Sequence, residues 1–153
     1  MILEIWTILN PIIRTFIYLT ALYSIGSVLF KVHFHKFFNE EINIYCKKII
    51  RDSALLGLII SILAFLSVAG NLGGEIQSIF EIDLIELSFE TIQGRSYLLL
   101  IVGFIFLFFS YYFQRNFMNA FNVIGTVLIL ISFIVIGHSL SQGIYTQILL
   151  LIH

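Results

Sequence analysis

The sequence is poor in charge and in cysteine, and each shortage limits what the protein can be. Only 11% of its 153 residues are charged, less than half of the roughly 25% that is typical of a soluble domain. Its single cysteine, Cys46, excludes a disulfide framework and a multi-cysteine metal cluster. The net charge is −1 and basic residues form no block, which argues against binding of nucleic acid. A phosphate-binding glycine loop and a nucleophile paired with a base are also missing, so we expect no enzyme.

Apolar residues dominate instead, at 59% of the chain with a mean hydropathy of +1.03. Crossing a bilayer as a helix takes about 20 apolar residues, and four runs meet or approach that length: 11–30, 53–70, 96–113 and 120–138. The runs lack the alternation of barrel strands, and a helix satisfies its own hydrogen bonds in hydrocarbon. We therefore predict an all-α, polytopic transmembrane helical bundle that forms a single domain over residues 1–153. Pro11 suits the first turn of the first helix, with Asn10 as its cap.

A fifth apolar run begins at residue 144 and reaches residue 153. Ten helical residues rise only about 15 Å, half the thickness of the hydrocarbon core. A carboxylate at that depth is costly. We therefore expect the chain to be a fragment of a longer membrane protein, and the alternative is a partner subunit that shelters this end. The oligomeric state is open.

The charges of the connections predict the orientation. The first connection, 31–52, holds five basic residues: Lys31, Lys36, Lys47, Lys48 and Arg51. The third, 114–119, holds Arg115. The second, 71–94, holds no Lys or Arg and five acids: Glu75, Glu81, Asp83, Glu86 and Glu90. The positive-inside rule then places the first and third connections in the cytoplasm and the N-terminus outside.

The acidic connection is itself amphipathic. Asp83, Glu86 and Glu90 recur at helical spacing, with Leu84 and Leu87 between them. This pattern predicts a short helix that lies at the outer interface. Its acids form a solvated face by default, and the alternative is that they gather cations or meet a partner.

Several short motifs resemble the bacterial copper resistance protein D family. The stretch GRSYLLLIVGFIFLFFSYYFQRN (94–116) is similar to the Gly-Arg-led third-span region of that family. IGS (25–27), IGH (136–138) and LLLIH (149–153) are similar to family motifs in the same order. The resemblance covers about residues 11–153 and rests on order and spacing.

The resemblance implies a copper function. It implies the first half of a bundle of about eight helices, a multi-pass protein of the bacterial inner (plasma) membrane. It also implies copper transport or homeostasis, with copper ions moved or relayed from the periplasm toward the cytoplasm. A soluble periplasmic copper-binding protein is the partner that the resemblance implies, beside the lipid bilayer itself.

Two histidines are the first candidate copper ligands, because neutral imidazole suits copper in either oxidation state. His138 closes the fourth run and His153 ends the fifth. On a helix, Gln142, Tyr145, Thr146 and His153 project toward one side, which predicts a polar stripe leading inward. The depth difference between the two histidines is roughly 12–15 Å, so they are successive positions on a path rather than one site. The alternative is that His138 ends a helix at the interface and His153 packs against a serine or carbonyl.

The basic connection offers a second, weaker candidate. His33 and His35 could form an inner release site near Cys46, but side chains two residues apart meet only in an extended segment. A basic segment that meets anionic headgroups is the alternative. Thioether ligands for Cu(I) are scarce, because the methionines are Met1 and Met118.

Arg14 is expected near the outer end of the first span. A cation in the first turn opposes the helix dipole, so we expect it to snorkel to water or to pair with an acid of the second connection. A role in the transport path is the alternative.

Two other functions compete with copper transport. Histidines in a helical bundle also occur in haem-binding cytochromes of the b type. The incomplete fifth span and the sparse polar content also fit a non-catalytic membrane subunit of a larger complex.

Overall fold

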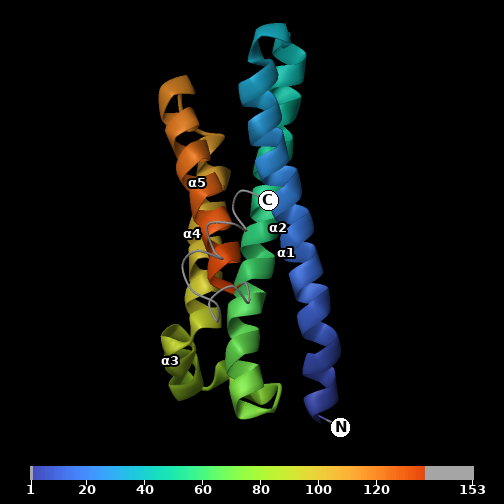
Figure 1. The fold of residues 1–153 in the computed structure, drawn as a ribbon, viewed down its shortest axis with the longest axis vertical. Coiled ribbons are helices and arrows are strands. Elements are labelled where there is room, and N and C mark those ends of the chain that lie inside the picture. Colours follow the sequence, from blue (N-terminus) through green and yellow to red (C-terminus); the bar gives the residue numbers. More distant parts are fainter. Residues whose placement is uncertain (1, 137–153) are drawn as a thin grey trace.

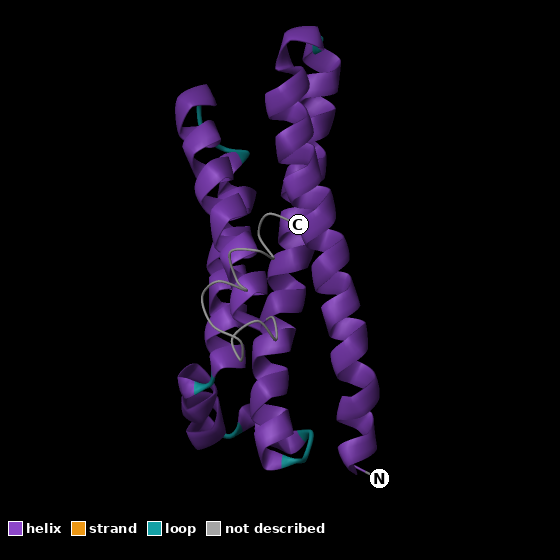
Figure 2. Cartoon of the chain, viewed as in Figure 1, coloured by secondary structure: helices purple, strands orange, loops and turns teal. Residues whose placement is uncertain are grey.

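The computed structural model describes residues 2–136, and this part of the chain is helical without strands. Figures 1 and 2 show long helices joined by short connections. The α-helices are α1 (Ile2–Phe34), α2 (Glu40–Gly73), α3 (Ile82–Glu90), α4 (Ile92–Ser110) and α5 (Arg115–Ile136). Two short 3-10 helices, His35–Phe37 and Gln77–Phe80, lie in the connections. Helices α1, α2, α4 and α5 are long and apolar enough to cross a membrane, which confirms the predicted fold class.

The four long helices run alternately up and down, and α2 lies between α1 and α4 (Figure 1). Helix α5 packs chiefly on α4 and barely touches α1. The hairpin of α1 and α2 extends past the α4–α5 turn at one end of the bundle. At the other end, α3 lies beside the ends of α2 and α4.

Helix α1 begins well before the predicted position. The expectation that Pro11 stands in a first turn capped by Asn10 is wrong, because the helix begins at Ile2 and Pro11 lies inside it. Proline is tolerated inside membrane helices, where neighbouring groups satisfy the backbone that it frees. The Asn10 side chain serves a different purpose, since its Nδ2 donates to Asn71 Oδ1 of α2 at 3.0 Å.

The basic connection between the first two helices is shorter than the predicted range of 31–52. Within residues 31–52, α1 continues to Phe34 and α2 begins at Glu40. Asn39 caps α2, because its side chain accepts a hydrogen bond from the Ile42 amide at 2.8 Å. Glu40 and Glu41 lie in the first turn of α2, where their negative charge stabilises the helix by interacting with the positive end of its dipole.

The acidic connection contains the predicted amphipathic helix. Helix α3 covers the residues whose spacing suggested it, and Asp83, Glu86 and Glu90 are all exposed. The same connection brings Glu75 and Glu81 to this end of the bundle, which we call the acidic end. The opposite end, formed by the α1–α2 hairpin tip and the α4–α5 turn, carries Lys31, Lys36, Lys47, Lys48 and Arg51 and is called the basic end.

The core is a seam to which all four long helices contribute, and its fully buried large side chains come from α4 and α5. Leu100, Phe104 and Leu107 of α4 and Ile129 of α5 are fully buried. Helices α4 and α5 come close through glycines, because a Cβ built on Gly125 would lie 2.7 Å from the Gly103 carbonyl oxygen. Such small residues allow close packing of membrane helices. Most other large apolar side chains are exposed on the outside of the bundle, as expected for a surface that faces lipid.

Candidate functional site

The Gly-Arg motif lies in the first turn of α4, beside the end of α3 at the acidic end. Thr91 caps α4 by accepting a hydrogen bond from the Gly94 amide at 2.9 Å and donates its own to the Ser88 carbonyl at 2.8 Å. A Cβ on Gly94 would collide with that Ser88 carbonyl. Arg95 Nε donates to the Phe89 carbonyl at 3.2 Å, which ties the end of α3 to the start of α4. The motif is therefore a structural joint that holds α3 against the bundle.

We expect Gly94→Ala to destabilise the protein by about 1–3 kcal/mol, the usual cost of overpacking. The physical reason is that the new methyl group would meet a backbone carbonyl, which cannot rotate away as a side chain can. Thermal unfolding of the purified protein in detergent, followed by circular dichroism, measures the change. Ile92→Ala, at an exposed position in the same turn, is the matched control. Equal melting temperatures for the two variants would contradict the assignment.

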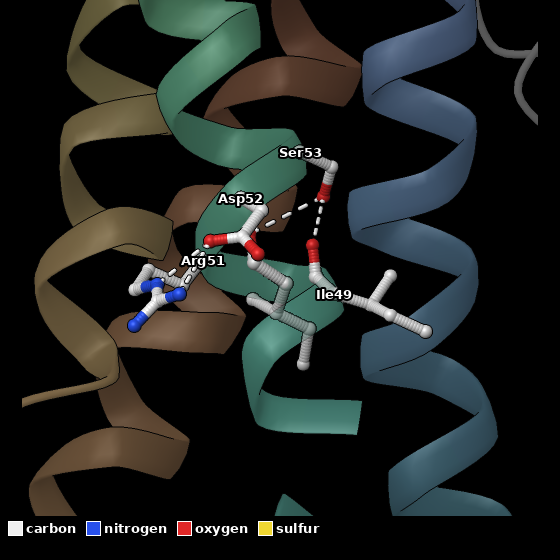
Figure 3. Close-up of polar contacts among 5 residues, drawn as sticks. Ile49, Arg51, Asp52 and Ser53 are labelled. Atoms are coloured by element: carbon white, nitrogen blue, oxygen red, sulfur yellow. Dashed lines mark hydrogen bonds and ion pairs between the residues drawn. The ribbon is translucent and has the colours of Figure 1, made fainter. Parts of the chain in front are cut away.

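Hydroxyl groups join α1 to α2 near the basic end. Ser24 and Ser53 lie with their Oγ atoms 2.8 Å apart, and Ser53 Oγ also lies 2.6 Å from the Ile49 carbonyl. Figure 3 shows Ser53 on the α1 side of α2, while Arg51 extends to the opposite side. Arg51 forms an ion pair with Asp52 at 2.7 Å (Figure 3). Its Cζ also lies 4.8 Å from the centroid of the Tyr111 ring, at the end of α4. These contacts fix the position of α2 between its two neighbours.

A cavity of about 640 Å³ opens at the basic end between the α1–α2 hairpin and the start of α5. Its polar lining includes Lys31, Asn39, Glu40, Asn43, Lys47, Asn119 and Asn122. Lys31 Nζ donates to Met118 Sδ at 3.3 Å, which links α1 to α5 across the cavity. Asn122 is 5% exposed, and its Oδ1 has no hydrogen-bond partner among the described residues. The arrangement is thus basic, amide-rich and incompletely paired.

Other buried polar groups without a partner in the described part lie elsewhere in the bundle. They are Trp6 Nε1, Ser61 Oγ and Thr126 Oγ1. Thr126 follows Asn122 by four residues, so the two share one face of α5. Lys47, Asn119 and Asn122 were not predicted from the sequence as site residues. Asparagines three residues apart at the start of an apolar helix were the signal that could have found them.

The two leading predicted copper ligands and the predicted polar path between them lie outside the described residues. This applies to His138, Gln142, Tyr145, Thr146 and His153, for which the structure makes no statement. Among the side chains that the structure describes, no three of His, Cys, Asp or Glu come together in a way that could hold a metal ion.

The weaker candidates lie on separate helical turns. The extended segment that a shared site of His33 and His35 would need is not found, because α1 ends at Phe34 and a 3-10 helix begins at His35. His33 is exposed and its ring packs edge-on against Phe34 at 4.7 Å. Cys46 belongs to α2, where it is buried.

Arg14 lies well inside α1 rather than in its first turn, and it is exposed. The ion pair described for residues 2–136 is Arg51–Asp52. None of the acids of the second connection pairs with Arg14, although all five of them are described.

Comparison with known proteins adds one decisive observation. The family model described as copper resistance protein D-like, N-terminal domain, matches residues 3–146. The chain belongs to this family. The match spans every helix described above and most of the part beyond them. No curated protein and no solved structure matches the chain.

Membership of the copper resistance protein D-like family, together with four helices able to cross a membrane, makes this a membrane protein with a role in copper resistance. Copper ions are the species with which such a protein interacts. In this family member, the Gly-Arg motif at residues 94–95 serves the joint between α3 and α4.

Proposed function

We propose that this protein moves or relays copper ions across the inner membrane. The observation that supports the proposal most directly is the family match over residues 3–146, which coincides with a bundle of membrane-crossing length. Copper is the cargo in this proposal, not a resident cofactor. The family match does not favour a haem-binding cytochrome or a non-catalytic subunit.

The proposed path enters on the periplasmic side. The alternating helices place the five exposed acids of the second connection at one end of the bundle and the basic residues of both other connections at the opposite end. By the positive-inside rule, the basic end faces the cytoplasm and the N-terminus lies outside. The acids on and near α3 would then raise the local concentration of copper ions or receive a periplasmic copper-binding protein. His138 and His153 would act as successive ligands further along the chain.

The experiment replaces both histidines by alanine and measures copper. Loss of ligands should lower the copper affinity of the purified protein by at least the roughly 10–100-fold that losing an outer-shell partner costs. In cells, the His138→Ala/His153→Ala variant should also change copper content and copper tolerance. Gln114→Ala, at an exposed turn residue, is the control and should behave as the unchanged protein.

The amount of each variant in the membrane fraction must be matched before copper is compared. Unchanged copper content and tolerance in the double variant would reject the two histidines as ligands. An absorption spectrum of the purified protein tests the haem alternative at the same time, because bound haem gives a Soret band.

A further inference from the structure

We propose that the cavity at the basic end binds the phosphate group of an anionic phospholipid. This assignment is independent of the copper function, because it concerns a different ligand and a different part of the molecule. It rests on the charge of the cavity, on an unpaired amide inside it and on its apolar side.

The charge of the cavity favours an anion. Lys31 of α1 and Lys47 of α2 line it from two facing helices, and both are half-buried. Glu40 is the carboxylate of the lining, and it is exposed to solvent at the N-terminus of α2, where its repulsion is screened. Two ammonium groups against one screened carboxylate leave the cavity positive. It is therefore unsuited to a copper ion and suited to phosphate, which lysine commonly binds as a point charge.

Amide groups supply further donors. Asn43, Asn119 and Asn122 line the same cavity, and each carries an NH₂ group with two donors. Asn122 is the informative member, because it is 5% exposed and its Oδ1 has no partner in the described residues. Buried amides are rarely left incompletely paired unless water, an ion or a ligand completes the set. Each of these amides can donate from its NH₂ group to an ester or phosphate oxygen, and its carbonyl oxygen can accept from a donor group of the headgroup.

The Lys31 ammonium is already aimed across the cavity. Its Nζ lies 3.3 Å from Met118 Sδ, and a thioether is a weak acceptor. A phosphate oxygen is a much stronger acceptor for an ammonium group, because both partners are ionised. A phosphate oxygen in the cavity would therefore be a stronger acceptor for this ammonium group than Met118 Sδ is.

The apolar side of the cavity favours a lipid over free phosphate. It is formed by Val28, Val32 and Val123, of which Val28 is 4% exposed while Val32 and Val123 are largely exposed. The cavity thus combines a basic, amide-rich mouth near the hairpin tip with an apolar wall that opens on the outer surface of the bundle. A phospholipid presents the same order, with a phosphate above its acyl chains. Basic pockets between membrane helices are a known way of binding lipid headgroups on the cytoplasmic side.

The test measures lipid retention by native mass spectrometry of the protein released from nanodiscs. Phosphatidylglycerol should remain bound to the unchanged protein, and phosphatidylcholine should not. The variant Lys31→Gln/Lys47→Gln should retain phosphatidylglycerol about 25-fold less, because one lysine near an anionic surface contributes roughly fivefold. Lys36→Gln/Lys48→Gln is the matched control, since it removes the same charge from exposed positions of the same hairpin outside the cavity.

Each outcome decides the proposal. Retention by the control and loss by the cavity variant support it, whereas equal loss in both would reduce the effect to general surface charge and overturn it. Equal retention of the two lipids by the unchanged protein would also overturn it. Displacement of the lipid by millimolar inorganic phosphate would keep the phosphate chemistry but overturn the lipid as the occupant.

A second variant guards against a folding defect in the first. Asn122→Leu keeps both lysines and removes the buried amide. We expect it to raise the melting temperature in lipid-free detergent, where the amide is unpaired, and to lower retention of phosphatidylglycerol. Unchanged retention of phosphatidylglycerol in this variant would overturn the binding role assigned to the Asn122 amide and the placement of the phosphate beside it in the cavity.

Discussion

Replacing Gly125 by leucine is expected to abolish the folded bundle. A Cβ at this position would lie 2.7 Å from the Gly103 carbonyl oxygen and 2.9 Å from Leu107. Neither neighbour can move away, because Gly103 presents its backbone and Leu107 is fully buried. Alanine at Gly125 should cost about 1–3 kcal/mol, as overpacking usually does, and the longer leucine side chain would force α5 off α4. Thermal unfolding in detergent, with size-exclusion chromatography, measures both variants.

Gly26 is the matched control for Gly125. It lies in the interior of α1, and a Cβ there would meet nothing within 4 Å. Gly26→Ala should therefore be stabilising by about 0.5–1 kcal/mol, because alanine costs less backbone entropy in a helix than glycine. If Gly125→Ala raised the melting temperature as Gly26→Ala does, the close approach of α4 and α5 would not exist in the protein.

The membrane-crossing helices were predictable because a bilayer imposes a simple requirement. In the bilayer, the backbone N–H and C=O groups of a long apolar run must be hydrogen-bonded to other protein groups, and a helix pairs them within a single segment. The short amphipathic helix α3 was predictable for a related reason, since Asp83, Glu86 and Glu90 repeat at the helical period. The first prediction depends on the length of the apolar runs and the second on the spacing of charged residues, and neither needs knowledge of tertiary contacts.

Helix ends and interhelical contacts were not predictable in the same way. Pro11 and Asn10 looked like a helix start, but Asn10 pairs with Asn71, which is 61 residues away in the sequence. The 31–52 stretch looked like a loop because it is charged, but Asn39 supplies a cap that starts α2 within it. In both cases the outcome depends on which partner a polar side chain finds, and local sequence does not specify that partner.

The sequence could identify candidate site residues by their chemical type, but not by their arrangement in space. The resemblance to the copper resistance protein D family implied copper, and histidine was chosen as the ligand because imidazole suits that metal. The family match now supports a copper role, but the roles of His138 and His153 stay predictions. The cavity beside Lys31 was missed because its lining comes from three helices and from the connection before α2. Single lysines and asparagines in apolar helices carry little signal until the fold brings them together.

Replacing Phe104 by alanine is expected to be the most destabilising single truncation in the described core. Phe104 is fully buried, and its ring fills the space beside Gly57 of α2. Truncation of a buried phenylalanine typically costs about 3–5 kcal/mol. In a bilayer this cost arises as lost van der Waals contact between helices, since lipid chains supply no hydrophobic force that drives helices together. Unfolding in mixed micelles, with an increasing fraction of a denaturing detergent, measures the free energy of unfolding for each variant.

The pair Gly57 and Phe104 allows a sharper version of this test. A Cβ on Gly57 would lie 2.5 Å from Cε1 and Cζ of the ring, so Gly57→Ala alone should destabilise the protein. Phe104→Leu alone leaves a gap at the same place, and combining it with Gly57→Ala should fill that gap. We expect a favourable coupling of about 1 kcal/mol or more, within the usual range for residues in contact. Gly26→Ala combined with Phe104→Leu is the control and should be additive to within about 0.5 kcal/mol, because Gly26 has no neighbour to transmit a change. Additivity in the Gly57–Phe104 pair as well would mean that α2 and α4 do not meet at these two residues.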